Sequence, residues 1–125
     1  MDSYTLVRPE HLNHHGFLFG GQLLKWVDEL AWLCATRTYP KTTLVTVGMD
    51  KIHFRHRVAN GAILRFQIEV IRLGTTSITC SVNVYADSPG ETVEDHVFDT
   101  QVTFVNINPK GDKTPLAPSL GPSLP

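Results

Sequence analysis

Residues 20–40 read GGQLLKWVDELAWLCATRTYP, and this stretch decides the fold. Its apolar residues recur with a period of about 3.6 and form one stripe along a helix: Leu23, Leu24, Val27, Leu30, Ala31, Cys34 and Ala35. Pro40 cannot continue a helix, so we expect the helix to span residues 20–39. Two glycines stand at its start, where Ser, Thr or Asp normally caps a helix. They leave backbone N–H groups open to something other than a side chain.

Beyond Pro40 the apolar residues alternate, which is typical of half-buried strands. The alternation covers four segments: residues 44–49, 64–70, 78–85 and 98–104. Because the connections between successive segments are short, we expect successive strands to be antiparallel neighbours. The sheet has to bury its apolar face, and the helix is the only large apolar partner in the sequence. The sequence therefore predicts an α+β domain in which an antiparallel sheet wraps around one long central helix.

The length and composition indicate one folded domain. Eleven Lys and Arg against twelve Asp and Glu give a net charge of −1, so no overall field attracts nucleic acid or an anionic membrane. No apolar stretch approaches the roughly 18–20 residues that span a bilayer, and the N-terminus lacks the features of a signal peptide. We therefore expect a cytoplasmic protein without a nucleic-acid or membrane partner. The folded domain is expected over residues 1–108 and a proline-rich tail over residues 109–125.

The residues suited to chemistry are concentrated between Asn13 and Asp28. Asp28 lies at the edge of the apolar stripe, where partial removal from water makes a carboxylate a stronger base. The alternative is a carboxylate on the helix flank that stays solvated or caps a loop. Gly20 and Asp28 are eight residues apart, which is about 12 Å along a helix. One reacting carbonyl cannot reach both from the same chain, so a site that uses both must lie between subunits.

The string N-x-x-G-x-x-F-G-G-x6-D, which runs from Asn13 to Asp28, resembles the signature of hotdog-fold acyl-CoA thioesterases of the YciA-like acyl-CoA hydrolase group. Residues 45–54 and 72–77 are similar to further parts of that family. The resemblance implies a hotdog fold and an enzyme that hydrolyses acyl-CoA to a free acid and CoA. It also implies a homodimer at least, assembled further into a tetramer or hexamer. Coenzyme A is then part of the substrate, and no separate cofactor or metal is expected.

The resemblance also assigns roles to four residues. Asp28 is the catalytic carboxylate, which either activates a water molecule or attacks the thioester itself. Asn13 from the opposite subunit hydrogen-bonds the thioester carbonyl or orients the water. The backbone N–H of Gly20 or Gly21 stabilises the oxyanion at the positive end of the helix. The three histidines nearby, His11, His14 and His15, match no common metal-ligand spacing.

Contacts with the CoA part of the substrate are expected at a further set of positions: Thr46, Arg55, Arg57, Gly74, Thr76 and Ser77. Many relatives carry a basic residue followed by proline after the position of Phe54, whereas residues 55–58 here read RHRV. Four basic residues fall on alternate positions, so that a strand presents them on one face: Lys51, His53, Arg55 and Arg57. Such a stripe suits the phosphates of CoA, and the alternative is a solvated strand face.

Two other functions stay open at the level of the sequence. Hotdog hydratases and dehydratases generally use a histidine with a carboxylate, and Asn13 stands in place of that histidine. A non-catalytic acyl-CoA sensor lacks the carboxylate or carries an effector domain, whereas this chain has Asp28. Trp26 and Trp32 lie near the helix edges, where they serve either a subunit interface, which we favour, or an acyl channel. The sequence gives no preference for a particular acyl chain.

Overall fold

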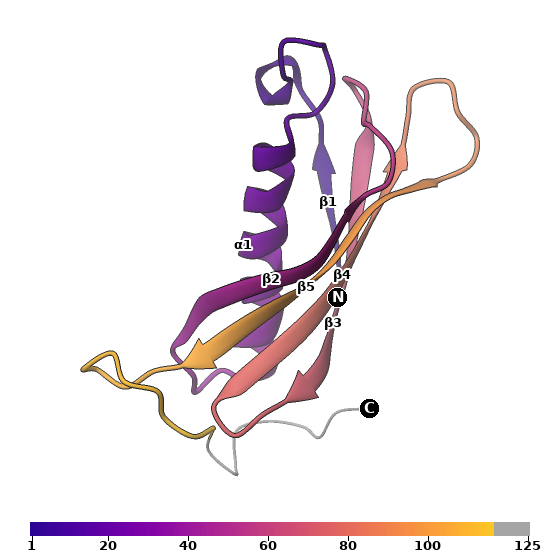
Figure 1. The fold of residues 1–125 in the computed structure, drawn as a ribbon. Helices are drawn as coiled ribbons and strands as arrows, with labels where there is room; N and C mark the ends of the chain where they lie inside the picture. Colours follow the sequence, from indigo (N-terminus) through magenta and orange to yellow (C-terminus); the bar gives the residue numbers. More distant parts are fainter. Residues whose placement is uncertain (117–125) are drawn as a thin grey trace.

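The computed structural model describes residues 1–116, which form one antiparallel sheet with a long helix against one face (Figure 1). The elements follow one another in this order: β1 (Asp2–Leu6), the short 3-10 helix η1 (Pro9–His11), α1 (Gly20–Thr38), β2 (Leu44–Phe54), β3 (Ile63–Leu73), β4 (Ser77–Asp87) and β5 (Asp95–Asn106). The strand order in the sheet is β1-β3-β4-β5-β2, and all pairs are antiparallel. The predicted α+β architecture, a sheet wrapped around one helix, is confirmed.

α1 forms where the sequence predicts a helix. It begins at Gly20 and ends at Thr38, and the N–H of Tyr39 donates to the carbonyl of Ala35 just before Pro40 stops the helix. Its buried residues all belong to the predicted apolar stripe: Leu23, Val27, Ala31, Cys34 and Ala35. They share one core with the inner face of the sheet, which contributes the largest fully buried side chains: Phe66, Phe98, Phe104, Leu64, Ile68 and Ile78. Both cysteines, Cys34 and Cys80, are buried free thiols.

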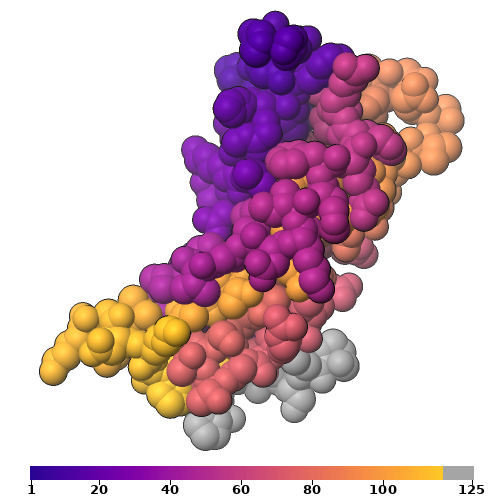
Figure 2. All heavy atoms as spheres, in the orientation of Figure 1, coloured from indigo at the N-terminus to yellow at the C-terminus, as the bar shows by residue number. Residues whose placement is uncertain are grey.

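The order of the strands differs from the predicted chain of neighbours. β3, β4 and β5 form the expected meander, but β2 pairs with β5 and not with β3. The prediction is wrong here because it treated this connection as short. Residues 55–62 are in fact long enough to cross the three strand spacings, of about 4.8 Å each, that separate β2 from β3. β1 was not predicted. Its residues alternate between exposed and half-buried, so no buried apolar face marks them as a strand in the sequence. β2 becomes an edge strand, and Figure 2 shows its residues at the surface.

The chain after β5 folds back on the domain as far as it is described. The side-chain amide of Asn106 donates to the carbonyls of Thr114 and Pro115, each at 3.4 Å, and the N–H of Leu116 donates to the carbonyl of Thr75 at 2.9 Å. The rest of the predicted tail, residues 117–125, lies outside the described residues, and the domain boundary after residue 108 stays a prediction. No helix within residues 1–116 combines the length and the apolar character needed to cross a membrane.

Candidate active site

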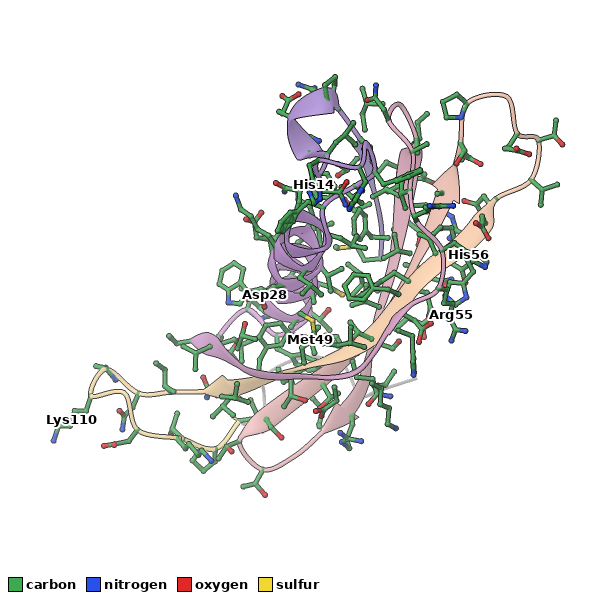
Figure 3. The ribbon with its side chains drawn as sticks, turned by 45° about the horizontal axis from the view of Figure 1, so that its top comes forward. His14, Asp28, Met49, Arg55, His56 and Lys110 are labelled. Atoms are coloured by element: carbon green, nitrogen blue, oxygen red, sulfur yellow. The ribbon has the colours of Figure 1, made fainter. Side chains whose placement is uncertain are left out.

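Asp28 lies partway along α1 beside β2, and its side chain is half-buried (Figure 3). The hydroxyl of Thr46, on β2, donates a hydrogen bond of 2.7 Å to Oδ1 of Asp28. No group within residues 1–116 donates to the second oxygen, Oδ2. The carboxylate is therefore held by one oxygen, while the other oxygen is available to a substrate or a water molecule.

A hollow of about 290 Å³ opens beside this carboxylate, and we call it the carboxylate pocket. Its lining consists of four residues of α1 and one of β2: Asp28, Glu29, Trp32, Leu33 and Thr46. The helix residues form two i,i+4 pairs, Asp28 with Trp32 and Glu29 with Leu33, so all four lie on the same face of α1. The pocket therefore combines two carboxylates with an aromatic and an aliphatic side chain one helical turn further along.

The other predicted catalytic groups lie at the N-terminal end of α1. Oδ1 of Asn13 accepts hydrogen bonds from the N–H groups of His15, at 2.9 Å, and Phe17, at 3.2 Å. These bonds occupy the carbonyl oxygen of the side chain and leave the Nδ2 hydrogens free to donate. In the described part of the chain, no group accepts a hydrogen bond from the backbone N–H of Gly20 or Gly21. We call the donors of Asn13, Gly20 and Gly21 the amide end.

A second hollow, of about 230 Å³, adjoins Gly20, and we call it the arginine pocket. Its lining combines the start of α1 with the end of β2 and the loop that follows: Leu18, Gly20, Leu23, Phe54, Arg55, His56, Arg57 and Val58. The guanidinium of Arg57 lies over the ring of Phe17, 4.6 Å from its centroid. No carboxylate among the described side chains pairs with Arg57, so its charge is available to an anion.

Arg55, the other arginine of this pocket, is already paired. It donates to Asp99, whose carboxylate also lies 3.0 Å from Nδ1 of His53. Burial raises the pKa of Asp99, but the hydrogen bonds from Arg55 and His53 outweigh this effect and bring the pKa below its ordinary value. Asp99 therefore stays ionised at neutral pH and balances the charge of Arg55.

The predicted stripe of four basic side chains on one strand face is wrong. β2 ends at Phe54, so Arg57 belongs to the following loop. A β-bulge between Asp50 and His53 breaks the alternation, with Lys51 at a positive φ of 52°. The extra residue of a bulge cannot be read from alternating residue types, which explains the error.

The other predicted CoA contacts lie elsewhere in the subunit. Gly74 and Thr76 lie in the turn between β3 and β4, and Ser77 begins β4. This turn and residues 55–57 stand at opposite ends of the sheet (Figure 1), so one subunit does not bring them together. A Cβ atom on Gly74 would lie 2.3 Å from Oγ of Ser77, so a larger residue there would have to turn the Ser77 hydroxyl away. Thr46, also predicted to contact CoA, lies against Asp28.

One feature of the site was missed by sequence reasoning. The contact of Thr46 with Asp28 joins a strand to a helix, and neither the spacing nor the period of the sequence signals it. The place of Trp32 beside the carboxylate agrees with the sequence, because Trp32 follows Asp28 by four residues and so shares its helix face. Trp26, in contrast, packs edge-on against Phe66 of the core, with the ring centroids 6.4 Å apart.

Residues 15–93 match the model of the thioesterase superfamily, and the chain belongs to this family. A hexameric hotdog fold thioesterase of Campylobacter jejuni superposes with a TM-score of 0.83 at 32% identity, over 94% of this chain and 90% of that one. The acyl-CoA hydrolase of Staphylococcus aureus, in complex with butyryl coenzyme A and coenzyme A, gives a TM-score of 0.84 at 27% identity over 93% and 70% of the two chains. These comparisons confirm the hotdog fold.

Curated proteins give the same family. Acyl-coenzyme A thioesterase 11 of Mus musculus is 35% identical over 100 residues, which cover 80% of this chain and 17% of that protein. Protein VdlD of Helicobacter pylori is 29% identical over 111 residues, or 89% of this chain and 63% of VdlD. The chain thus spans less than two thirds of the length of these curated relatives.

Proposed function

We propose that this protein is an acyl-CoA thioesterase that hydrolyses acyl-CoA to a free carboxylic acid and CoA. The observation that carries the proposal is the carboxylate of Asp28, held by Thr46 through one oxygen and free at the other, beside a partly apolar pocket. Relatives named as acyl-CoA thioesterases support it, as does the complex of the Staphylococcus aureus enzyme with butyryl coenzyme A. Solved variants of that enzyme replace one asparagine and one aspartate, separated along its chain as Asn13 and Asp28 are here.

The site is completed, in this proposal, by a second copy of the chain. Gly20 and Asp28 both lie in α1, eight residues or about 12 Å apart, so one thioester cannot contact the amide end and the carboxylate of the same subunit. A two-fold axis supplies each group from a different subunit and generates two equivalent sites.

β2 is the proposed dimer contact. It is the edge strand beside the carboxylate pocket, and it exposes a row of apolar side chains: Val45, Val47, Ile52 and Phe54. An exposed apolar edge is a template for pairing with another strand. Thr46, near the start of β2, lies at the carboxylate pocket. Phe54, at the end of β2, lies at the amide end, because a Cβ atom on Gly20 would be 3.4 Å from the Phe54 ring. Antiparallel pairing of two β2 strands therefore sets the amide end of one subunit beside the carboxylate pocket of its partner.

This arrangement polarises and attacks a thioester without a strong acid. The carbonyl oxygen accepts hydrogen bonds from the open N–H groups of Gly20 or Gly21, at the positive end of α1, and from Nδ2 of Asn13. Asp28 of the other subunit either removes a proton from an attacking water or attacks the carbonyl carbon itself. On the second route the C–S bond breaks, CoA leaves as a thiolate, and water then hydrolyses the acyl–Asp28 anhydride to regenerate the carboxylate.

The CoA phosphates are assigned to the arginine pocket. Arg57 offers a guanidinium without a carboxylate partner in residues 1–116, while Arg55 is balanced by Asp99. Coenzyme A enters as part of the substrate, and we propose a dimer as the unit of activity, with a hexamer as its further assembly. Hexamers are described for several solved relatives, including that of Campylobacter jejuni. The cytoplasmic location and the absence of a nucleic-acid or membrane partner stay predictions.

Release of free thiol from acyl-CoA substrates tests this function. Wild type and Asp28→Asn are compared side by side, with the oligomeric state of both measured by light scattering. We expect turnover by the wild type and loss of nearly all turnover in the variant, with unchanged assembly. Tight acyl-CoA binding without any turnover by the wild type would instead identify a sensor, and hydration of an enoyl-CoA would identify a hydratase.

A further inference from the structure

Two hydrogen bonds connect α1 to β2 where these elements line the carboxylate pocket. The first joins Thr46 to Asp28, at 2.7 Å, and the second joins Nε1 of Trp32 to the carbonyl of Leu44, at 3.0 Å. On the helix the two bonded residues are one turn apart, and on the strand they are two positions apart, so the bonds form successive rungs. The first rung holds the reactive carboxylate, and the second holds an indole ring.

The rungs give the pocket a polar and an apolar end. Asp28, Glu29 and Thr46 supply the polar groups, and Trp32 and Leu33 supply the apolar lining one turn further along α1. Contact with apolar side chains favours hydrocarbon over water. An acyl group whose carbonyl carbon lies at Asp28 therefore extends toward Trp32.

The indole ring of Trp32 is fixed in place. Its N–H is bonded to the backbone of Leu44, a buried residue at the start of β2, although 39% of Trp32 is exposed. A swing of the ring away from the pocket would break this bond and leave a backbone carbonyl without its donor. Trp32 is therefore a rigid wall.

The wall stands close to the carboxylate. Asp28 and Trp32 are four residues apart, which corresponds to about 6 Å along the helix axis, a length that about four or five carbon–carbon bonds cover in an extended chain. A longer acyl chain meets the ring and has to bend or displace it.

We propose that Trp32 determines acyl-chain specificity by closing the carboxylate pocket, so that the enzyme prefers short acyl-CoAs, of about six carbons or fewer. The inference rests on the proposed function and deepens it by naming the substrate class. It assigns to Trp32 no part in the bond-breaking step.

The test compares kcat/KM for acetyl-, butyryl-, hexanoyl-, octanoyl-, lauroyl- and palmitoyl-CoA in the wild type, Trp32→Ala and Trp32→Leu. One methylene more or less in an apolar pocket changes this ratio by about 10- to 200-fold. We expect the wild type to lose about tenfold or more between hexanoyl- and octanoyl-CoA. In the two variants, the ratio of octanoyl- to butyryl-CoA turnover should rise by about tenfold or more.

Two variants serve as controls. Trp32→Phe keeps an aromatic wall without the N–H, and its octanoyl-to-butyryl ratio is expected to lie between those of the wild type and Trp32→Ala. Trp26→Phe alters the other tryptophan of α1, which packs against Phe66 away from the pocket, and the ratio should stay at the wild-type value.

The outcomes separate this inference from the proposed function. No turnover of any acyl-CoA by the wild type would refute the function. Turnover with a wild-type preference for palmitoyl-CoA, or with a ratio that rises in neither Trp32→Ala nor Trp32→Leu, would overturn the assignment of Trp32 alone. Should Trp32→Ala fail to fold, Trp32→Leu, which keeps an apolar side chain of good helix propensity, decides the question.

Discussion

Replacing Thr46 with valine removes the hydroxyl that holds Asp28 and keeps a side chain of nearly the same shape. The lost contact is the 2.7 Å hydrogen bond from Thr46 to Oδ1 of Asp28. A hydrogen bond to a charged group contributes about 1.5–3 kcal/mol, and the exposure of Thr46 favours the lower limit. A loss of about 1.5 kcal/mol in transition-state stabilisation corresponds to about a tenfold fall in kcat/KM.

The assay is steady-state release of thiol by Thr46→Val and Thr46→Ser. We expect kcat to fall about tenfold in Thr46→Val with KM little changed, because the hydroxyl positions the carboxylate and does not bind CoA. Thr46→Ser keeps the hydroxyl and should stay close to the wild type. A raised KM with unchanged kcat in Thr46→Val would refute this reasoning and restore the role that the family resemblance suggests for Thr46, a contact with CoA.

Three further predictions concern the amide end and the arginine pocket. Gly20→Ala should leave the unfolding temperature unchanged or higher, since its Cβ meets only the ring of Phe54 at 3.4 Å, while kcat/KM falls about tenfold as the methyl group crowds the oxyanion site. Arg57→Gln should raise KM for acyl-CoA and weaken the dependence of KM on salt. Arg55→Gln should change KM less, and equal effects of the two variants on KM would contradict the pairing of Arg55 with Asp99. The lowered pKa of Asp99 gives a contribution to stability that is present above its unfolded pKa of about 4 and is lost as the pH falls. Urea denaturation of Asp99→Asn should therefore show about 0.5–1 kcal/mol less stability at pH 7 and a weaker loss on acidification, whereas an unchanged pH dependence would contradict this.

The sequence predicts best those features that depend on neighbouring residues. The periodicity between Gly20 and Thr38 is unbroken, and Pro40 ends it, so the bounds of α1 agree to one residue. The meander of β3, β4 and β5 follows from clear alternation and short turns. Asp28 is notable in the sequence because a charged carboxylate stands at the edge of an apolar stripe, whose other residues favour burial.

The features that the sequence did not predict are set by contacts between distant segments. The pairing of β2 with β5 is a choice between two possible neighbours, and loop length alone does not make it. The bulge at Lys51 inserts one residue without any change in residue type and breaks the alternation of Lys51 with His53, while Arg57 lies beyond the end of β2 at Phe54. The bond from Thr46 to Asp28 needs β2 to lie beside α1, which only the folded sheet provides.

The central claim is that each active site combines the amide end of one subunit with Asp28 of its partner. Mixing two inactive variants, Asn13→Ala and Asp28→Asn, tests it most directly. After dissociation and random re-pairing, half of the dimers are mixed, and each mixed dimer holds one intact site made from the unaltered Asn13 of one chain and the unaltered Asp28 of the other. The account predicts recovery of about one quarter of the wild-type rate of thiol release. A mixture that stays as inactive as its two components, although mixed dimers are shown to form, would contradict it.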